Sequence, residues 1–208
     1  LFILGVEWTN TGENAMGIFP VWQRPIAALF QSVTLRTAGF NTLEMSSLLD
    51  ATKVLCVVFM FIGAGSGSTG GGVKVSTFLL LVYAVTSEIR GRNSIIIRKY
   101  QVPRVAVQRA IAIFIMGMAL VLILSILLCF SEAEALASGR LSYIDLLFES
   151  VSAFGTVGLS AANTSDLSSL SHAIMIPVMF MGRVGPITVA VSLALREPKE
   201  YSSVYPEG

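Results

Sequence analysis

Thr37-Ala38-Gly39-Phe40-Asn41-Thr42 is the stretch around which this chain is organised. A related stretch, Thr156-Val157-Gly158-Leu159-Ser160, follows at a spacing of 119 residues between the two glycines. The preceding sequence also recurs, because Leu29-Phe30-Gln31-Ser32-Val33 corresponds to Leu147-Phe148-Glu149-Ser150-Val151 with an offset of 118 residues. Self-similarity at so long a spacing indicates a duplicated module. Each copy reads as an apolar helix, a short apolar helix, a Thr-x-Gly strip and a second apolar helix.

The two Thr-x-Gly strips suit the binding of a dehydrated cation. Potassium gives up its water only where oxygens replace it, and backbone carbonyls turned towards one axis can do so. Turning successive carbonyls the same way requires backbone angles that a Cβ disfavours, which explains the glycines. Thr156-Val157-Gly158 also matches the start of the potassium-channel filter. We therefore predict K⁺ at Thr37, Gly39, Thr156 and Gly158, within a filter formed by Thr37, Ala38, Gly39, Phe40, Thr156, Val157, Gly158 and Leu159.

The composition is that of an integral membrane protein in a lipid bilayer. Of 208 residues, 54% are hydrophobic and 13% are charged, and the mean hydropathy is +0.75; soluble domains carry far more charge. The net charge of +1 gives no indication of a nucleic-acid partner.

Cys56 and Cys129 lie in apolar runs without metal-ligand spacing, so we expect free thiols. Residues 1–8 read as the last turns of a helix, and we expect the sequence to be a fragment.

Segment length separates spanning helices from re-entrant ones. Residues 106–130 form the clearest transmembrane helix, since a crossing takes about twenty apolar residues. Residues 25–36 and 142–154 are too short to cross and fit re-entrant helices, whose C-terminal ends direct partial negative charge towards a cation. We expect Ser142 to cap the second of these helices, with Asp145 in its first turn.

A glycine tract, residues 63–72, interrupts another crossing. The apolar pieces on either side, 53–62 and 77–85, are each too short to span the membrane. Irregular backbone at that depth must be satisfied by protein or water, so we expect the tract to face a conduction path. A phosphate-binding loop is disfavoured because Val73 separates Gly72 from Lys74. A gate and a plain packing kink both remain open; the gate hypothesis uses Gly63, Gly65, Gly67, Gly70, Gly71, Gly72, Lys74 and Arg183.

Charged residues orient the chain. Residues 88–109 carry six arginines and lysines against one acid, which predicts a cytoplasmic connection. Residues 9–17 and 131–140 are then external. His172 stands alone at a polar boundary, where we expect a surface role.

Two arginines lie in otherwise apolar surroundings. Arg36 either reaches the interface or braces the filter against a carboxylate. Arg183, opposite Ala64 in the repeat, either raises a barrier to cations beside the glycine tract or pairs structurally with Glu149. The surrounding Gly182-Arg183-Val184-Gly185-Pro186 is expected to interrupt and bend its helix.

Together these motifs resemble the Trk/Ktr/HKT superfamily of potassium transporters, and in particular the C-terminal half of bacterial Ktr/Trk membrane subunits. The resemblance implies an all-α integral membrane fold, similar to potassium channels, of tandem helix-pore loop-helix repeats with re-entrant pore helices and filter strands. Residues 1–104 are then the third repeat, with a truncated first helix and a cytoplasmic connection at 88–104. Residues 105–208 are the fourth repeat with a short cytoplasmic tail. The motifs that carry the resemblance are Arg36-Thr37-Ala38-Gly39-Phe40-Asn41-Thr42, Gly67-Ser68-Thr69-Gly70-Gly71-Gly72-Val73-Lys74, Phe154-Gly155-Thr156-Val157-Gly158-Leu159-Ser160 and Gly182-Arg183-Val184-Gly185-Pro186.

The same resemblance implies a multi-pass subunit of the bacterial inner membrane that conducts K⁺ into the cell, passively or coupled to Na⁺. It implies no cofactor, a homodimer of membrane subunits and a cytoplasmic nucleotide-binding regulatory ring. Two of the four filter strands are absent, so we expect these residues alone not to conduct selectively. The alternative is a secondary transporter of another fold, with a small solute bound between broken helices. An enzyme is disfavoured because one histidine and no paired intramembrane acids leave no catalytic constellation.

Overall fold

The computed structural model describes residues 2–12, 15–65, 68, 70–91, 95–97 and 100–195. Gly67 of the predicted gate and the predicted tail, 196–208, lie outside these residues. The described chain is helical apart from one antiparallel hairpin. Its elements are α1 (Phe2–Glu7), η1 (Met16–Ile18), α2 (Arg24–Thr34), α3 (Asp50–Phe61), α4 (Val75–Ile89), β1 (Ile96–Ile97), β2 (Tyr100–Gln101), α5 (Arg104–Ser131), α6 (Ala133–Ala137), α7 (Tyr143–Gly155), η2 (Thr164–Asp166) and α8 (Ser169–Leu195).

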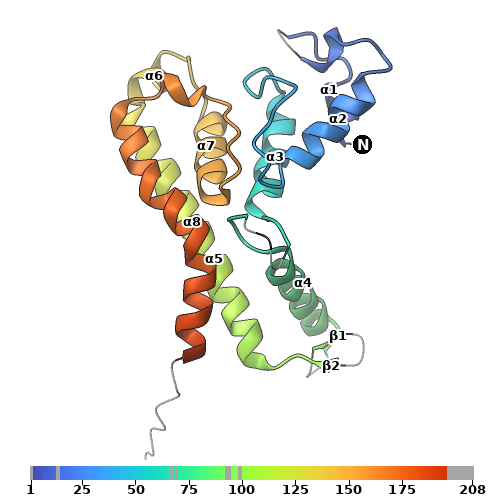
Figure 1. Cartoon of the computed structure of the whole chain (residues 1–208), viewed down its shortest axis with the longest axis vertical. Helices are drawn as coiled ribbons and strands as arrows, with labels where there is room; N and C mark the ends of the chain where they lie inside the picture. The colour runs from blue at the N-terminus through green and yellow to red at the C-terminus, as the bar shows by residue number, and fades with distance from the viewer. Residues whose placement is uncertain are drawn as a thin grey trace, which may run out of the picture.

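Helix α7 is the centre of the molecule. It packs against α3, α5 and α8, and most of its side chains are buried. Because α3 belongs to the first half of the sequence and α7 to the second, their contact joins the two halves. Figure 1 shows α5, α7 and α8 side by side, with α1, α2 and α3 on the other side of α7, whereas α4 lies beyond the end of α7 and packs against α5.

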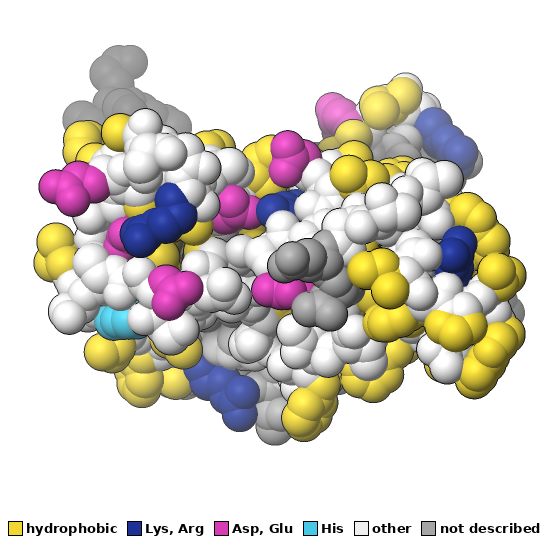
Figure 2. Space-filling model, turned by 90° about the horizontal axis from the view of Figure 1, so that it is seen from above, with side chains coloured by type: hydrophobic (Ala, Val, Ile, Leu, Met, Phe, Trp, Pro, Cys, Tyr) yellow, Lys and Arg dark blue, Asp and Glu magenta, His cyan; other side chains and the backbone are white. Residues whose placement is uncertain are grey.

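The two ends of the molecule carry the segments expected on opposite sides of a membrane. The stretch after α1 lies at the same end as α6, whereas the hairpin lies at the other end with the last turn of α8 (Figure 1). Viewed from the α6 end, charged side chains lie across the face and many hydrophobic ones lie around its rim (Figure 2). A polar end with an apolar rim is typical of a protein surrounded by lipid.

Among the described residues, one helix is long and apolar enough to cross a membrane by length and composition. Helix α5 has 28 residues, and its most apolar 18-residue stretch has a mean hydropathy of 3.0 with only 28% of that stretch buried. Helices α2 and α7 have 11 and 13 residues. At about 1.5 Å per residue, α7 is roughly 20 Å long, which is less than the roughly 30 Å hydrocarbon core. These lengths agree with those predicted for one spanning and two short helices.

Helix α8 is continuous from Ser169 to Leu195. The predicted interruption at 182–186 is therefore wrong as a break in the helix. Gly182 has a packing role instead, because a Cβ there would collide with the carbonyl oxygen of Phe154 at the end of α7. On the opposite side, a Cβ at Gly117 of α5 would come within 2.9 Å of the Phe154 ring. Two glycines thus let α5 and α8 close on the same turn of α7.

Asp145 fixes the start of α7 in two ways. Its Oδ2 accepts the Ser142 backbone N–H at 3.0 Å, which confirms its expected place in the first turn. Its Oδ1 accepts Lys53 Nζ at 2.7 Å, and the two side chains are only 12% and 7% exposed. This buried ion pair links α3 to α7, and it was not predicted from the sequence. Breaking such a pair costs about 3–5 kcal/mol because one charge is left unpaired.

Glu132 anchors the start of α8 at the outer end of α5. It is 5% exposed and accepts the Ser168 N–H and the Ser171 hydroxyl, both at 2.7 Å. Burial alone would raise its pKa, but these hydrogen bonds and the charge of Arg140 outweigh burial and hold the pKa below its ordinary value. Nearby, His172 Nε2 lies 2.7 Å from the Thr164 carbonyl oxygen, which is a structural contact.

We predict that Gly182→Ala destabilises the protein by about 1–3 kcal/mol, because the added methyl group forces α8 away from α7. Thermal unfolding of the protein in detergent measures the effect. Gly5→Ala is the matched control, since a Cβ at that helical glycine meets nothing within 4 Å. Equal melting temperatures for the two variants would contradict the assigned packing role.

Candidate functional site

The two Thr-x-Gly strips meet in the middle of the molecule. They follow the C-terminal ends of α2 and α7, and a Cβ at Gly39 would lie 2.7 Å from the Val157 carbonyl oxygen. A Cβ at Gly158 would lie 3.6 Å from the Gly39 Cα. The sequence predicted this pairing of two segments that are far apart in the chain. Of the other strip residues, Val157 and Leu159 are buried, whereas Ala38 and Phe40 are exposed.

The strips share an unusual backbone conformation. Positive φ angles occur at Thr37 (68°), Gly39 (75°), Thr156 (52°) and Gly158 (86°), so the same two positions of each strip are left-handed. Such angles are uncommon for a β-branched residue such as threonine and mark strain or function. In the first strip, the Thr34 hydroxyl helps to hold this geometry by donating to the Phe40 carbonyl oxygen. Thr34 was not among the predicted site residues, although a polar residue in the last turn of an apolar helix is visible in the sequence.

The glycine tract lies directly against the two strip threonines. A Cβ at Gly70 would come within 2.8 Å of Thr37 Oγ1, and one at Gly71 within 2.8 Å of Thr156 Oγ1. The Gly71 N–H also donates to Thr156 Oγ1 at 2.9 Å. Successive glycines thus contact the corresponding threonines of the two strips. The structure therefore brings these residues of the predicted gate and filter together.

The other glycines of the predicted gate differ in their surroundings. A Cβ at Gly63 would collide with the Gly71 carbonyl oxygen, and one at Gly72, whose φ is +75°, would lie 3.1 Å from the Phe61 oxygen. Gly65 is open, because a Cβ there would meet nothing within 4 Å. Close packing therefore constrains both ends of the tract but leaves Gly65 unconstrained.

Main-chain hydrogen bonds close the base of the glycine tract. Ile62 and Val73 form a parallel bridge, with the Gly63 N–H donating to the Val73 oxygen at 2.8 Å and the Val73 N–H to the Phe61 oxygen at 3.1 Å. Inside the loop, Lys74 Nζ donates to the Gly70 oxygen at 2.6 Å and the Ser68 oxygen at 2.9 Å. Lys74 thereby satisfies carbonyls that no helix or sheet would satisfy.

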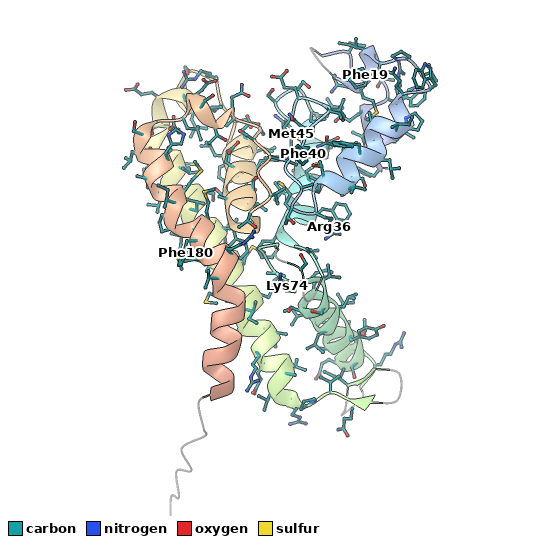
Figure 3. All side chains as sticks on the ribbon, viewed as in Figure 1. Phe19, Arg36, Phe40, Met45, Lys74 and Phe180 are labelled. Atoms are coloured by element: carbon teal, nitrogen blue, oxygen red, sulfur yellow. The ribbon has the colours of Figure 1, made fainter. Side chains whose placement is uncertain are left out.

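Arg36 connects the first strip to the same loop. Its guanidinium donates to the carbonyl oxygens of Ile62 at 2.5 Å and Gly63 at 3.1 Å, and it lies 5.5 Å from the Phe59 ring centroid. Its partners are therefore carbonyls at the end of α3 rather than a carboxylate. Figure 3 shows Arg36 and Lys74 close to the break between α3 and α4.

Arg183 forms no ion pair with Glu149 in the described part of the chain, where the ion pair found joins Lys53 to Asp145. Glu149 instead accepts hydrogen bonds from residues 160–164. Pairing with Glu149 is therefore the wrong alternative, and the barrier to cations that Arg183 would raise beside the glycine tract stays a prediction.

A polar hollow opens beyond the strips towards the α6 end. Gly39, Asn41, Gly158, Ser160 and Asp166 are among its lining residues. Backbone and amide oxygens can coordinate a hard monovalent cation without any charged ligand. The strips thus lie between a polar hollow on one side and the glycine tract on the other, within a largely apolar protein.

Known proteins resemble this chain over almost its whole length. Residues 2–205 match the family described as TrkH, cation transport protein. The chain is 38% identical to Ktr system potassium uptake protein B of Vibrio alginolyticus, over 89% of this chain and 39% of that protein. It is 34% identical to the protein of the same name from Bacillus subtilis (strain 168), over 100% of this chain and 44% of that one.

A solved structure has the same fold. The potassium transporter TrkH from Vibrio parahaemolyticus matches with a TM-score of 0.61 at 21% identity, over 92% of this chain and 41% of that chain. The chain thus spans about two fifths of the length of the relatives it matches. This match supports the predicted fold and disfavours a secondary transporter of another fold.

We predict that Gly71→Ala displaces the glycine tract, because its methyl group would lie within 2.9 Å of both outer atoms of the Thr156 side chain. Losing the Gly71 N–H bond should cost about 1 kcal/mol, which corresponds to roughly fivefold faster hydrogen exchange in residues 63–74. Gly65→Ala, which has open space, serves as the control and should exchange as the parent does. Unchanged hydrogen exchange in Gly71→Ala would contradict the predicted displacement of the tract and loss of the Gly71 hydrogen bond.

Proposed function

Since this chain belongs to the TrkH family of cation transport proteins, we propose that it is part of a membrane subunit through which potassium enters the cell. The observation that carries the proposal is the contact between the two Thr-x-Gly strips at Gly39 and Gly158. The Ktr system relatives are described as potassium uptake proteins, which supports the same cargo here. The cell membrane is then its location, with residues 9–17 outside.

The strips act as two strands of a potassium filter. Carbonyl oxygens of residues 37–40 and 156–159 replace the hydration shell of the ion, and the hydroxyls of Thr37 and Thr156 add an inner layer of oxygens. The C-terminal ends of α2 and α7 point their partial negative charge at the same place. Residues 1–104 and 105–208 each supply one strand, and two further strands complete a ring of four.

The glycine tract acts as the gate below this filter. Gly70 and Gly71 lie against the innermost filter threonines, so an ion leaving the filter meets the loop before it meets the cytoplasm. The positive charges of Lys74 and Arg183 raise the energy of a cation at this level. Conduction therefore requires the tract to move away from Thr156, which breaks the Gly71 hydrogen bond.

The transporter works as a homodimer of membrane subunits controlled by a cytoplasmic nucleotide-binding ring. The end of the molecule with the hairpin and the cationic connection, residues 88–109, faces this regulatory component. Transport is either passive or coupled to Na⁺, with K⁺ as the main cargo and no bound cofactor.

We predict that Gly39→Ser or Gly158→Ser lowers the preference for potassium over sodium by about tenfold, a change of roughly 1.4 kcal/mol in relative binding. A side chain at these left-handed positions forces the carbonyls away from the ion. Uptake of both ions is measured in cells that lack potassium uptake and express the complete reading frame that encodes this chain. Gly139→Ser is the matched control, because Gly139 also has a positive φ of 70° but lies after α6. Normal selectivity in both strip variants would refute the filter.

We also predict that deletion of residues 70–72 raises the potassium uptake rate several-fold, because the barrier below the filter is removed. Initial rates in the same cells are normalised to the amount of protein in the membrane. Gly65→Ala should leave the rate unchanged. A deletion variant that reaches the membrane and transports at the parental rate would leave the tract with a packing role only.

A further inference from the structure

Glu149 is a buried carboxylate directly behind the second strip. It is 3% exposed, and its Oε1 accepts the Ser160 hydroxyl at 2.5 Å and the N–H groups of Ala161 at 2.9 Å and Ala162 at 3.1 Å. Its Oε2 accepts the Thr164 hydroxyl at 3.2 Å. These donors belong to the segment in which the strip ends. Glu149 therefore fixes where the second strip leaves the filter.

All four of these donors to Glu149 are electrically neutral. The ion pair found among the described residues joins Lys53 to Asp145, and in that part of the chain no cationic side chain lies within ion-pairing distance of Glu149. Burial disfavours a charge on Glu149, whereas its four hydrogen bonds favour the ionised carboxylate, because two of them come from backbone N–H groups that can only donate. In its ionised form the carboxylate brings a negative charge that no cation pairs with among the described residues.

This charge lies beside the ion path. Glu149, Thr156, Gly158 and Thr164 line the same hollow on the flank of the second strip. An uncompensated negative charge near a partly desolvated cation attracts it strongly, because protein screens charges less than water does. The position of Glu149 thus suits it to raise the affinity of the second strip for a cation.

The first copy of the repeat lacks such a charge. The position that corresponds to Glu149 is Gln31, by the alignment of Leu29–Val33 with Leu147–Val151. Gln31 is fully buried, its Nε2 lies 3.1 Å from Met45 Sδ, and its Oε1 has no hydrogen-bond partner. The two strips share their backbone shape but differ in the charge behind them.

We propose that Glu149 is a positioning residue whose negative charge makes the second strip the tighter cation-binding side of the filter. The inference rests on the proposed function. It assigns a further role to a side chain that touches neither the gate nor the ion. The carboxylate acts through two routes, the hydrogen bonds that hold residues 160–164 and the field that it exerts on the ion.

The test is Glu149→Gln in the complete reading frame, expressed in cells that lack potassium uptake. Glutamine keeps an oxygen for the three Oε1 donors, and its amide can donate to the Thr164 hydroxyl, so the change removes the charge and keeps the shape. We expect the KM for K⁺ to rise about tenfold, with the maximal rate within about twofold of the parent. Glu132→Gln is the control, because it neutralises another buried, serine-bound carboxylate, whose partners Ser168 and Ser171 are not strip residues, and it should leave KM unchanged.

A second variant separates charge from geometry and covers a failure of Glu149→Gln to reach the membrane. Glu149→Asp keeps the charge but cannot reach all four donors, so we expect a lower rate or less protein with a KM within about threefold of the parent. A tenfold change in KM for Glu149→Asp would overturn the charge-based inference.

The two proposals fail in different ways. If the parent supports no potassium uptake, the proposed function fails. If the parent transports potassium and Glu149→Gln has the parental KM, only the role of Glu149 is refuted.

Discussion

Three stretches of main chain converge in this protein, with only the two strip threonine side chains between the glycine tract and the strips. Gly39 lies against Val157 and Gly158, and Gly70 and Gly71 lie against the strip threonines. A Cβ at any of the glycines 39, 70 and 71 would approach its neighbour closer than 3 Å. This backbone contact is the constraint on which the surrounding helices depend, because α2, α3 and α7 must end where the three stretches converge.

The convergence leaves backbone polar groups away from water, and the polar side chains of the site satisfy them. Arg36 donates to the carbonyl oxygens at the end of α3, Lys74 donates to those within the tract, and the Thr156 hydroxyl accepts an N–H from Gly71. In a lipid-surrounded protein such groups would otherwise cost several kcal/mol each. The same cations that stabilise the irregular backbone therefore also place positive charge beside the glycine tract.

Sequence alone was enough to predict the features that depend on local composition. The two strips, the short helices before them, the spanning helix α5 and the place of Asp145 in the first turn of α7 follow from period, length and capping chemistry. Contacts between residues distant in sequence could not be predicted in this way. Lys53 and Asp145 are 92 residues apart, and the carbonyls that bind Arg36 carry no sequence signal because every residue has one. Helix α8 was expected to break at a proline, yet transmembrane helices tolerate proline where neighbours satisfy the freed carbonyl.

The two copies of the repeat share the glycines of the strips but differ in the side chains that hold each strip in place. Both strips keep glycine at 39 and 158, because both positions have a positive φ that a Cβ disfavours, and at Gly39 the nearby Val157 oxygen also excludes a side chain. The residues behind each strip only need to supply hydrogen bonds to its backbone or to the residues that follow it, and different side chains can supply them. The first copy uses the hydroxyl of Thr34 on Phe40, and the second uses the carboxylate of Glu149 on residues 160–164. A duplicated backbone can thus carry unequal charges, so under the proposed function the two strips need not bind a cation equally.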